Sequence, residues 1–78
     1  MPISALITRV REDRADALAA DAMAYFVAAS DMIKETPPDA PDAYQRRVVA
    51  HQLAARAERL TARSYWWRPA PTKEANNP

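Results

Sequence analysis

Apolar side chains recur every three or four residues along two long segments of the chain, a spacing that predicts two amphipathic helices. In the first segment, residues 3–35, the repeating positions are Ile3, Leu6, Ile7, Val10, Leu18, Ala22, Phe26, Ala29 and Ile33. In the second segment, residues 40–67, they are Val49, Leu53, Leu60 and Trp67. The charged residues 11–14 interrupt the first pattern. We interpret them as a solvated turn of one continuous helix; the alternative is a break between a short helix and a longer one.

A proline-rich turn at residues 36–41 separates the two helical segments. Prolines at positions 37, 38 and 41 move the residues before them out of the helical region, so the first helix is expected to end near Glu35. Asp39 is the expected N-cap of the second helix, because its carboxylate can accept hydrogen bonds from the free amides of the next turn. The second helix is expected to end before Pro69. Residues 69–78 are polar and proline-flanked, which predicts a disordered tail after a single hairpin domain, 1–68.

The charges divide between the two segments. Residues 1–42 carry four basic and eight acidic side chains, whereas residues 43–68 carry six arginines and one glutamate. If the helices fold back across the turn, residues whose numbers add to about 75 face each other. That register places Val49 against Phe26 and Trp67 against Ile7. It also predicts three pairs of opposite charge: Arg63 with Glu12, Arg59 with Asp16, and Arg46 with Asp31.

These patterns predict an all-α fold, an antiparallel two-helix hairpin. Two helices cannot surround a core, so we expect a homodimer that forms a four-helix bundle of coiled-coil type, or a constitutive complex with another protein. Alanine-rich faces on both helices would allow a second copy to approach closely. The residues expected in the core or the dimer interface are Leu18, Phe26, Ile33, Val49, Leu53, Leu60 and Trp67.

Composition excludes several classes of functional site. The chain has no cysteine to form a disulfide or a zinc–thiolate site, and no glycine to form a phosphate-binding loop. His51 is interpreted as a helix-surface histidine rather than a metal ligand. Asp13, Asp16 and Asp21 are interpreted as solvated charges, because paired catalytic acids need a pocket that a thin hairpin does not offer. We expect no catalytic residue, no metal and no cofactor.

The chain is expected to be cytoplasmic and not to enter a membrane. Its longest uncharged stretch in the helical region, residues 22–30, is far shorter than a bilayer-spanning helix. Small, helical, glycine-free chains of this composition recur among phage and mobile-element regulators and among accessory subunits of bacterial complexes, a similarity of size and composition alone.

Two groups of residues on the second helix are candidates for binding. Arg56, Arg59 and Arg63 form a stripe that either pairs with the acidic first helix, the interpretation we favour, or follows nucleic-acid phosphates. The run from Tyr65 to Arg68 contains three successive aromatic residues, which spread over about 200° of a helix and cannot all face one core. Trp67 fits the apolar stripe, so Trp66 and Tyr65 are left for a partner or for capping the hairpin across a dimer.

The sequence therefore favours a non-enzymatic, protein-binding hairpin that acts as a small regulator, inhibitor or accessory subunit. The partner is expected to be another, unidentified protein, bound through Arg63, Tyr65, Trp66 and Arg68. The alternative is a dimeric nucleic-acid-binding protein that uses Arg56, Arg59 and Arg63. A third, weaker alternative is an enzyme whose active site forms between subunits.

Overall fold

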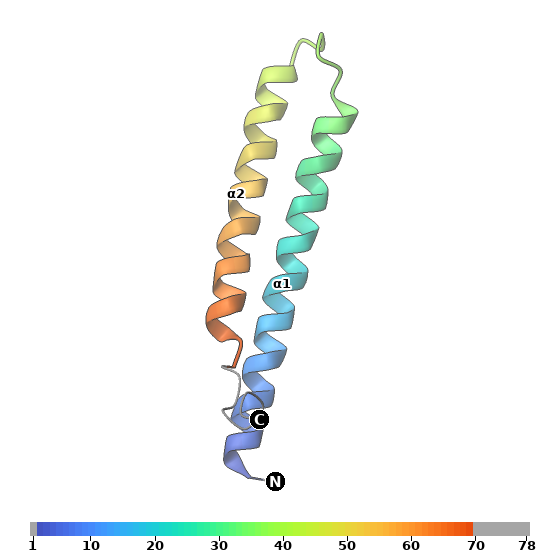
Figure 1. Cartoon of the computed structure of the whole chain (residues 1–78). Coiled ribbons are helices and arrows are strands. Elements are labelled where there is room, and N and C mark those ends of the chain that lie inside the picture. The colour runs from blue at the N-terminus through green and yellow to red at the C-terminus, as the bar shows by residue number, and fades with distance from the viewer. Residues whose placement is uncertain (1, 70–78) are drawn as a thin grey trace, which may run out of the picture.

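The computed structural model describes residues 2–69 and contains two helices, α1 (Ile3–Glu35) and α2 (Ala43–Trp67), which lie side by side in opposite directions (Figure 1). The all-α hairpin expected from the apolar pattern is confirmed. Apart from Pro69, the expected tail at 69–78 lies outside the described residues. Within residues 2–69, neither helix has the length and apolar character needed to span a membrane.

Helix α1 runs without a break through the charged residues 11–14, so the interpretation of one continuous helix is confirmed. Pro2 precedes its first turn in an extended conformation, and its carbonyl accepts the backbone N–H of Leu6 at 3.2 Å. At the other end the side-chain hydroxyl of Thr36 donates to the Met32 carbonyl at 2.6 Å. That bond occupies one of the carbonyls that a helix end leaves without an amide partner.

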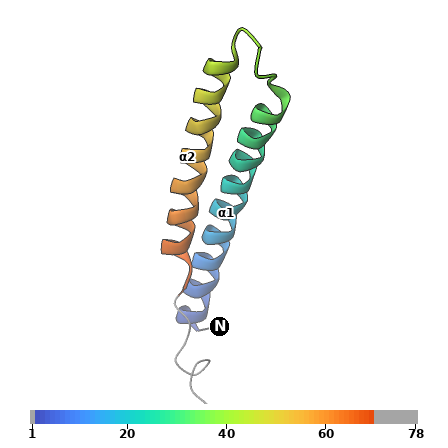
Figure 2. The same ribbon diagram turned by 45° about the horizontal axis from the view of Figure 1, so that its top comes forward.

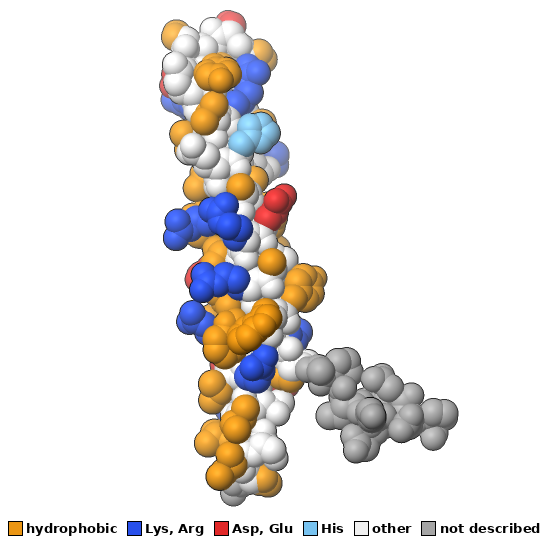
Figure 3. Space-filling view, turned by 90° about the vertical axis from the view of Figure 1, so that its left-hand side faces the viewer, with side chains coloured by type: hydrophobic (Ala, Val, Ile, Leu, Met, Phe, Trp, Pro, Cys, Tyr) orange, Lys and Arg blue, Asp and Glu red, His pale blue; other side chains and the backbone are white. Residues whose placement is uncertain are grey.

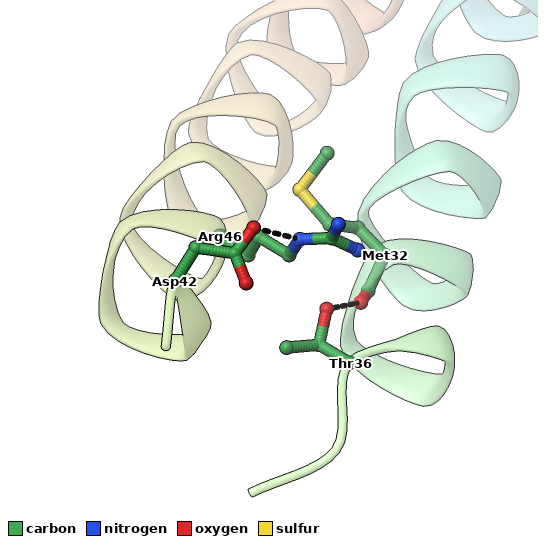
Figure 4. A network of polar contacts seen from close by, with 4 residues as sticks. All are labelled: Met32, Thr36, Asp42 and Arg46. Carbon is green, nitrogen blue, oxygen red and sulfur yellow. Dashed lines mark hydrogen bonds and ion pairs between the residues drawn. The ribbon is translucent and has the colours of Figure 1, made fainter. Parts of the chain in front are cut away.

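Helix α2 begins at Ala43, three residues later than the sequence indicates, and Asp42 rather than Asp39 occupies the N-cap. The delay arises because residues 37–43 form two successive tight turns: the N–H of Ala40 donates to the Pro37 carbonyl, and the N–H of Ala43 donates to the Ala40 carbonyl. The Asp42 carboxylate makes no capping bond; it accepts a 2.7 Å hydrogen bond from Arg46 one turn into the helix (Figure 4).

Small residues at seven-residue intervals form the seam between the helices. The buried positions are Ala15, Leu18, Ala22 and Ala29 in α1, and Ala43, Ala50, Ala57 and Ser64 in α2. A heptad interval returns a side chain to nearly the same face of a helix, so each helix presents an alanine row to the other. The one polar member, Ser64, is satisfied because its hydroxyl donates to the Thr61 carbonyl at 2.8 Å.

The register of the hairpin differs from the expected one by about one helical turn. The buried positions of α1 and α2 match in pairs whose numbers add to 79, as for Ala22 with Ala57 and Ala29 with Ala50. The expected sum was about 75. The difference arises because the closely spaced helices place alanines, rather than the large apolar stripe, between them. Phe26 consequently lines a groove with Thr61 and Tyr65, not with Val49.

Most large apolar side chains lie outside the seam. Of the seven residues expected in the core or dimer interface, Leu18 is buried and Leu53, Leu60 and Trp67 are half-buried, but Phe26, Ile33 and Val49 are exposed. Within residues 2–69, no large side chain is fully buried. The structure thus leaves three of the seven residues outside the core of the single chain. The reason is geometric, because two helices joined through alanines leave no room for larger groups between them.

The shift in register also leaves the first turns of α1 beyond the end of α2, as both ribbon views show (Figures 1 and 2). This overhang carries the exposed apolar residues Ile3, Leu6, Ile7 and Val10. The expected contact between Trp67 and Ile7 is replaced by contacts of Trp67 with Arg11 and Arg14.

Candidate functional site

The three neighbouring aromatic side chains at the end of α2 point in different directions. Trp67 is half-buried, whereas Tyr65 is 72% and Trp66 is 67% exposed. Successive residues of a helix are rotated by about 100°, and the contacts differ accordingly: Tyr65 lines a groove with Phe26, whereas Trp66 lies against Arg11 and Trp67. The two tryptophan rings meet edge to face with their centroids 5.2 Å apart. Trp66 is therefore exposed to solvent and supported from behind by its neighbour.

Arg11 of α1 is the residue that organises this end, and it was not among the candidates identified from the sequence. Its guanidinium lies 5.2 Å from the Trp66 ring centroid and 5.5 Å from that of Trp67. It also donates a 2.9 Å hydrogen bond to the backbone carbonyl of Trp66. The cation faces two electron-rich rings and satisfies a carbonyl at the negative end of the helix dipole. A register that adds to 79 would have identified Arg11, because it places residue 11 beside the last turn of α2.

Arg68 ends α2 and fastens it to α1. Its backbone N–H donates to the carbonyls of Ser64 and Tyr65, and its guanidinium pairs with the Asp16 carboxylate at 3.1 Å. Asp16 was expected to pair with Arg59. Both side chains of the observed pair are substantially exposed, so the pair contributes little to stability, about 0–1 kcal/mol. The pair instead fixes the position of the Arg68 side chain. Because Arg68 already contacts α1, it is less available to a partner than Arg63.

The arginine stripe of α2 does not pair with the acidic side chains of α1. Among residues 2–69, the ion pairs are Arg46 with Asp42 and Arg68 with Asp16, so the favoured interpretation of the stripe is wrong for this chain alone. Arg56 instead lies over the Tyr25 ring, 5.1 Å from its centroid. Arg56, Arg59 and Arg63 line one shallow depression around Leu60. Basic side chains gather along one edge of the outer surface of α2 in Figure 3.

The hairpin has two chemically different sides, which follow from the seam. A residue four positions after a buried alanine projects to one side, and a residue one position before it projects to the other. We call the first side the apolar flank, and with the adjoining positions of α1 and α2 it carries Ala19, Met23, Phe26, Ile33, Arg47, Ala54, Thr61, Tyr65 and Arg68. The second, the arginine flank, carries Arg14, Asp21, Val49, Arg56, Arg59, Arg63 and Trp66. His51 and Glu58 border the apolar flank.

Polar groups capable of chemistry are dispersed along the hairpin. His51 is exposed on α2, and the Asp13, Asp16 and Asp21 side chains are exposed on α1. Residues 2–69 contain no group of three histidine or acidic side chains placed to hold a metal ion. Comparison of the chain with protein-family models, with curated proteins and with solved structures finds no match.

Proposed function

We propose that the protein is a non-enzymatic interaction module that binds another protein through Trp66, with Arg63 beside it on the arginine flank. The observation that carries this proposal is the 67% exposure of a tryptophan that the fold nevertheless holds in place through Arg11 and Trp67. Tyr65 and Arg68 belong to the other side of the helix end. We further propose that the working form is a homodimer with four helices.

Exposure and fixed position together favour recognition. Tryptophan and arginine are enriched among the residues that dominate binding free energy at protein interfaces. A side chain that is already ordered loses less conformational entropy on binding than a mobile one, and the contacts of Trp66 supply that order before any partner arrives.

The test is substitution of Trp66 by alanine in an affinity capture from host extract at moderate salt. Tyr44 is 74% exposed at the opposite end of α2, so Tyr44→Ala removes an equally accessible aromatic ring as a matched control. Capture that survives Tyr44→Ala and falls by about 30-fold or more with Trp66→Ala supports the proposal. Equal capture by both variants, with helicity unchanged by circular dichroism, refutes it.

The unpaired arginine stripe supports a second candidate, a nucleic-acid-binding surface. Arg56, Arg59 and Arg63 share a flank with Trp66, and basic side chains beside an exposed aromatic ring suit single-stranded nucleic acid. Under this proposal, affinity for an oligonucleotide falls steeply with salt, and Arg59→Glu lowers the slope of log affinity against log salt by about one or more. Arg9→Glu, an exposed position on the first turns of α1 beyond the end of α2, is the control. An absence of binding at low salt rejects this candidate.

A further inference from the structure

We propose that two copies of the chain pack through their apolar flanks, with α1 of each copy lying against α2 of the other. This inference specifies the surface of the proposed homodimer and does not depend on what Trp66 binds. The occupant of the flank is a second copy of the same chain, and the assembly is a closed four-helix bundle.

The single hairpin has a weak core, which is the first reason to expect association. Its seam consists of alanines, one leucine and one serine. A buried methyl group contributes about 0.8 kcal/mol, whereas a fully buried leucine or phenylalanine contributes about 1.5–3 kcal/mol. The large apolar residues that would supply the remaining stability are those left on the outside of the hairpin.

The two flanks differ in the charge that α1 carries, which indicates the side that associates. On α1, the apolar flank and its border are uncharged from Ala19 to Ile33, where they carry Ala19, Met23, Phe26, Ser30 and Ile33. The arginine flank carries Asp21 over the same stretch, and α2 brings Arg56, Arg59 and Arg63 to it. A charged side chain is costly to desolvate without a partner, so the uncharged stretch of α1 favours association through this side, where Arg47 and Glu58 of α2 must keep contact with water or with an opposite charge.

The sizes of the side chains indicate which helices meet. On the apolar flank α1 presents large residues, Met23, Phe26 and Ile33, whereas the middle of α2 presents small ones, Ala54, Thr61 and Ala62, together with Glu58. Large residues of one copy fit over small residues of the other only when α1 lies on the partner's α2. Because numbers adding to 79 lie at one level of the hairpin, Phe26 then packs near the partner's Ala54, and the two-fold axis repeats the contact.

The size of the flank matches that of a stable interface. The 25 residues of α2 span about 37 Å, and two helices side by side are about 20 Å wide. One flank therefore covers about 750 Å², and two copies together bury about 1,500 Å², which is within the range of specific protein interfaces, roughly 1,200–2,000 Å². Trp66 lies on the opposite flank and remains accessible in this dimer.

Two residues of nearly equal exposure provide a matched test. Phe26 is 40% exposed on the apolar flank, and Val49 is 41% exposed on the arginine flank. Both lie outside the buried seam, so neither Phe26→Glu nor Val49→Glu should unfold the hairpin. In sedimentation equilibrium, we expect a dimer for the natural chain and for Val49→Glu, and a dimer dissociation constant raised at least 100-fold for Phe26→Glu. A monomeric natural chain, or a dimer lost only with Val49→Glu, overturns the proposal.

The arrangement of the copies is tested separately by a distance. The chain has no cysteine, so Asp39→Cys in the turn accepts a single spin label. With α1 on the partner's α2 the two turns lie at the same end, and the label-to-label distance should be about 20–30 Å. If like helices pack together, the turns lie at opposite ends and the distance is about 40 Å or more, which overturns the proposed packing. Trp66→Ala should leave both readouts unchanged, so failure of the dimer and failure of partner docking are distinguishable.

Discussion

Replacing Ala22 with leucine tests the alanine seam directly. Ala22 is buried, and it lies at the level of Ala57, which is also buried. Leucine is close to alanine in helix propensity, so the substitution changes volume at the seam and little else in the isolated helix. Three additional carbon atoms on each chain must push the helices apart or force strained rotamers. Overpacking of this kind costs about 1–3 kcal/mol, which corresponds to a fall in melting temperature of about 5–20 °C for a domain of this size.

The control lies two residues further along the same helix. Ala24 is exposed on the arginine flank, so Ala24→Leu has the same propensity and composition but no seam to distort. Thermal unfolding followed by circular dichroism measures both variants, at several protein concentrations because association contributes to apparent stability. If Ala22→Leu is as stable as Ala24→Leu, the helices do not meet through alanines, and the register assigned here is incorrect.

Three other predictions concern the ends of the hairpin. Arg11→Gln should red-shift and broaden the combined emission of Trp66 and Trp67, since it removes the cation from both rings and the hydrogen bond from the last turn of α2; unchanged fluorescence would count against these contacts of Arg11. The hydrogen bond from Arg46 holds the pKa of Asp42 below its ordinary value of 3.8, so Arg46→Gln should raise that pKa in an NMR titration. Because the pKa is lowered, the pair stabilises the fold above pH 3.8 and loses this effect as the pH falls through the lowered value. Amides of residues 3–10, beyond the end of α2, should exchange hydrogen faster than those of the seam.

The C-terminal ends of both helices were predictable because their causes are local. Prolines at 37 and 69 act on the residues beside them whatever the rest of the chain does, and α1 and α2 end at Glu35 and Trp67. The exposure of Trp66 also followed from local geometry, since three successive aromatic residues must spread around the helix.

The seam was not predictable by the same means. Ranking faces by side-chain size selects Phe26 and Val49 as neighbours, whereas close helix packing selects the smallest side chains. The alanine heptads are visible in the sequence, but alanine occurs on several faces of both helices, so the pattern alone does not identify the buried row. The position of Arg11 over the tryptophans depends on the register and could not be found without it.

A row of identical small residues at a constant interval has translational symmetry. Sliding one helix by seven residues, about 10 Å, would bring alanine opposite alanine again over most of the seam. The seam therefore holds the helices together without choosing among such positions. The alignment of the helices is fixed at the two ends of the hairpin. At one end the length of the proline segment sets it, and at the other end the contacts of Arg11 and Arg68 at the last turn of α2 do so. If the connection were lengthened and the contacts of Arg11 and Arg68 were removed, the two helices could pack in several alignments of nearly equal energy.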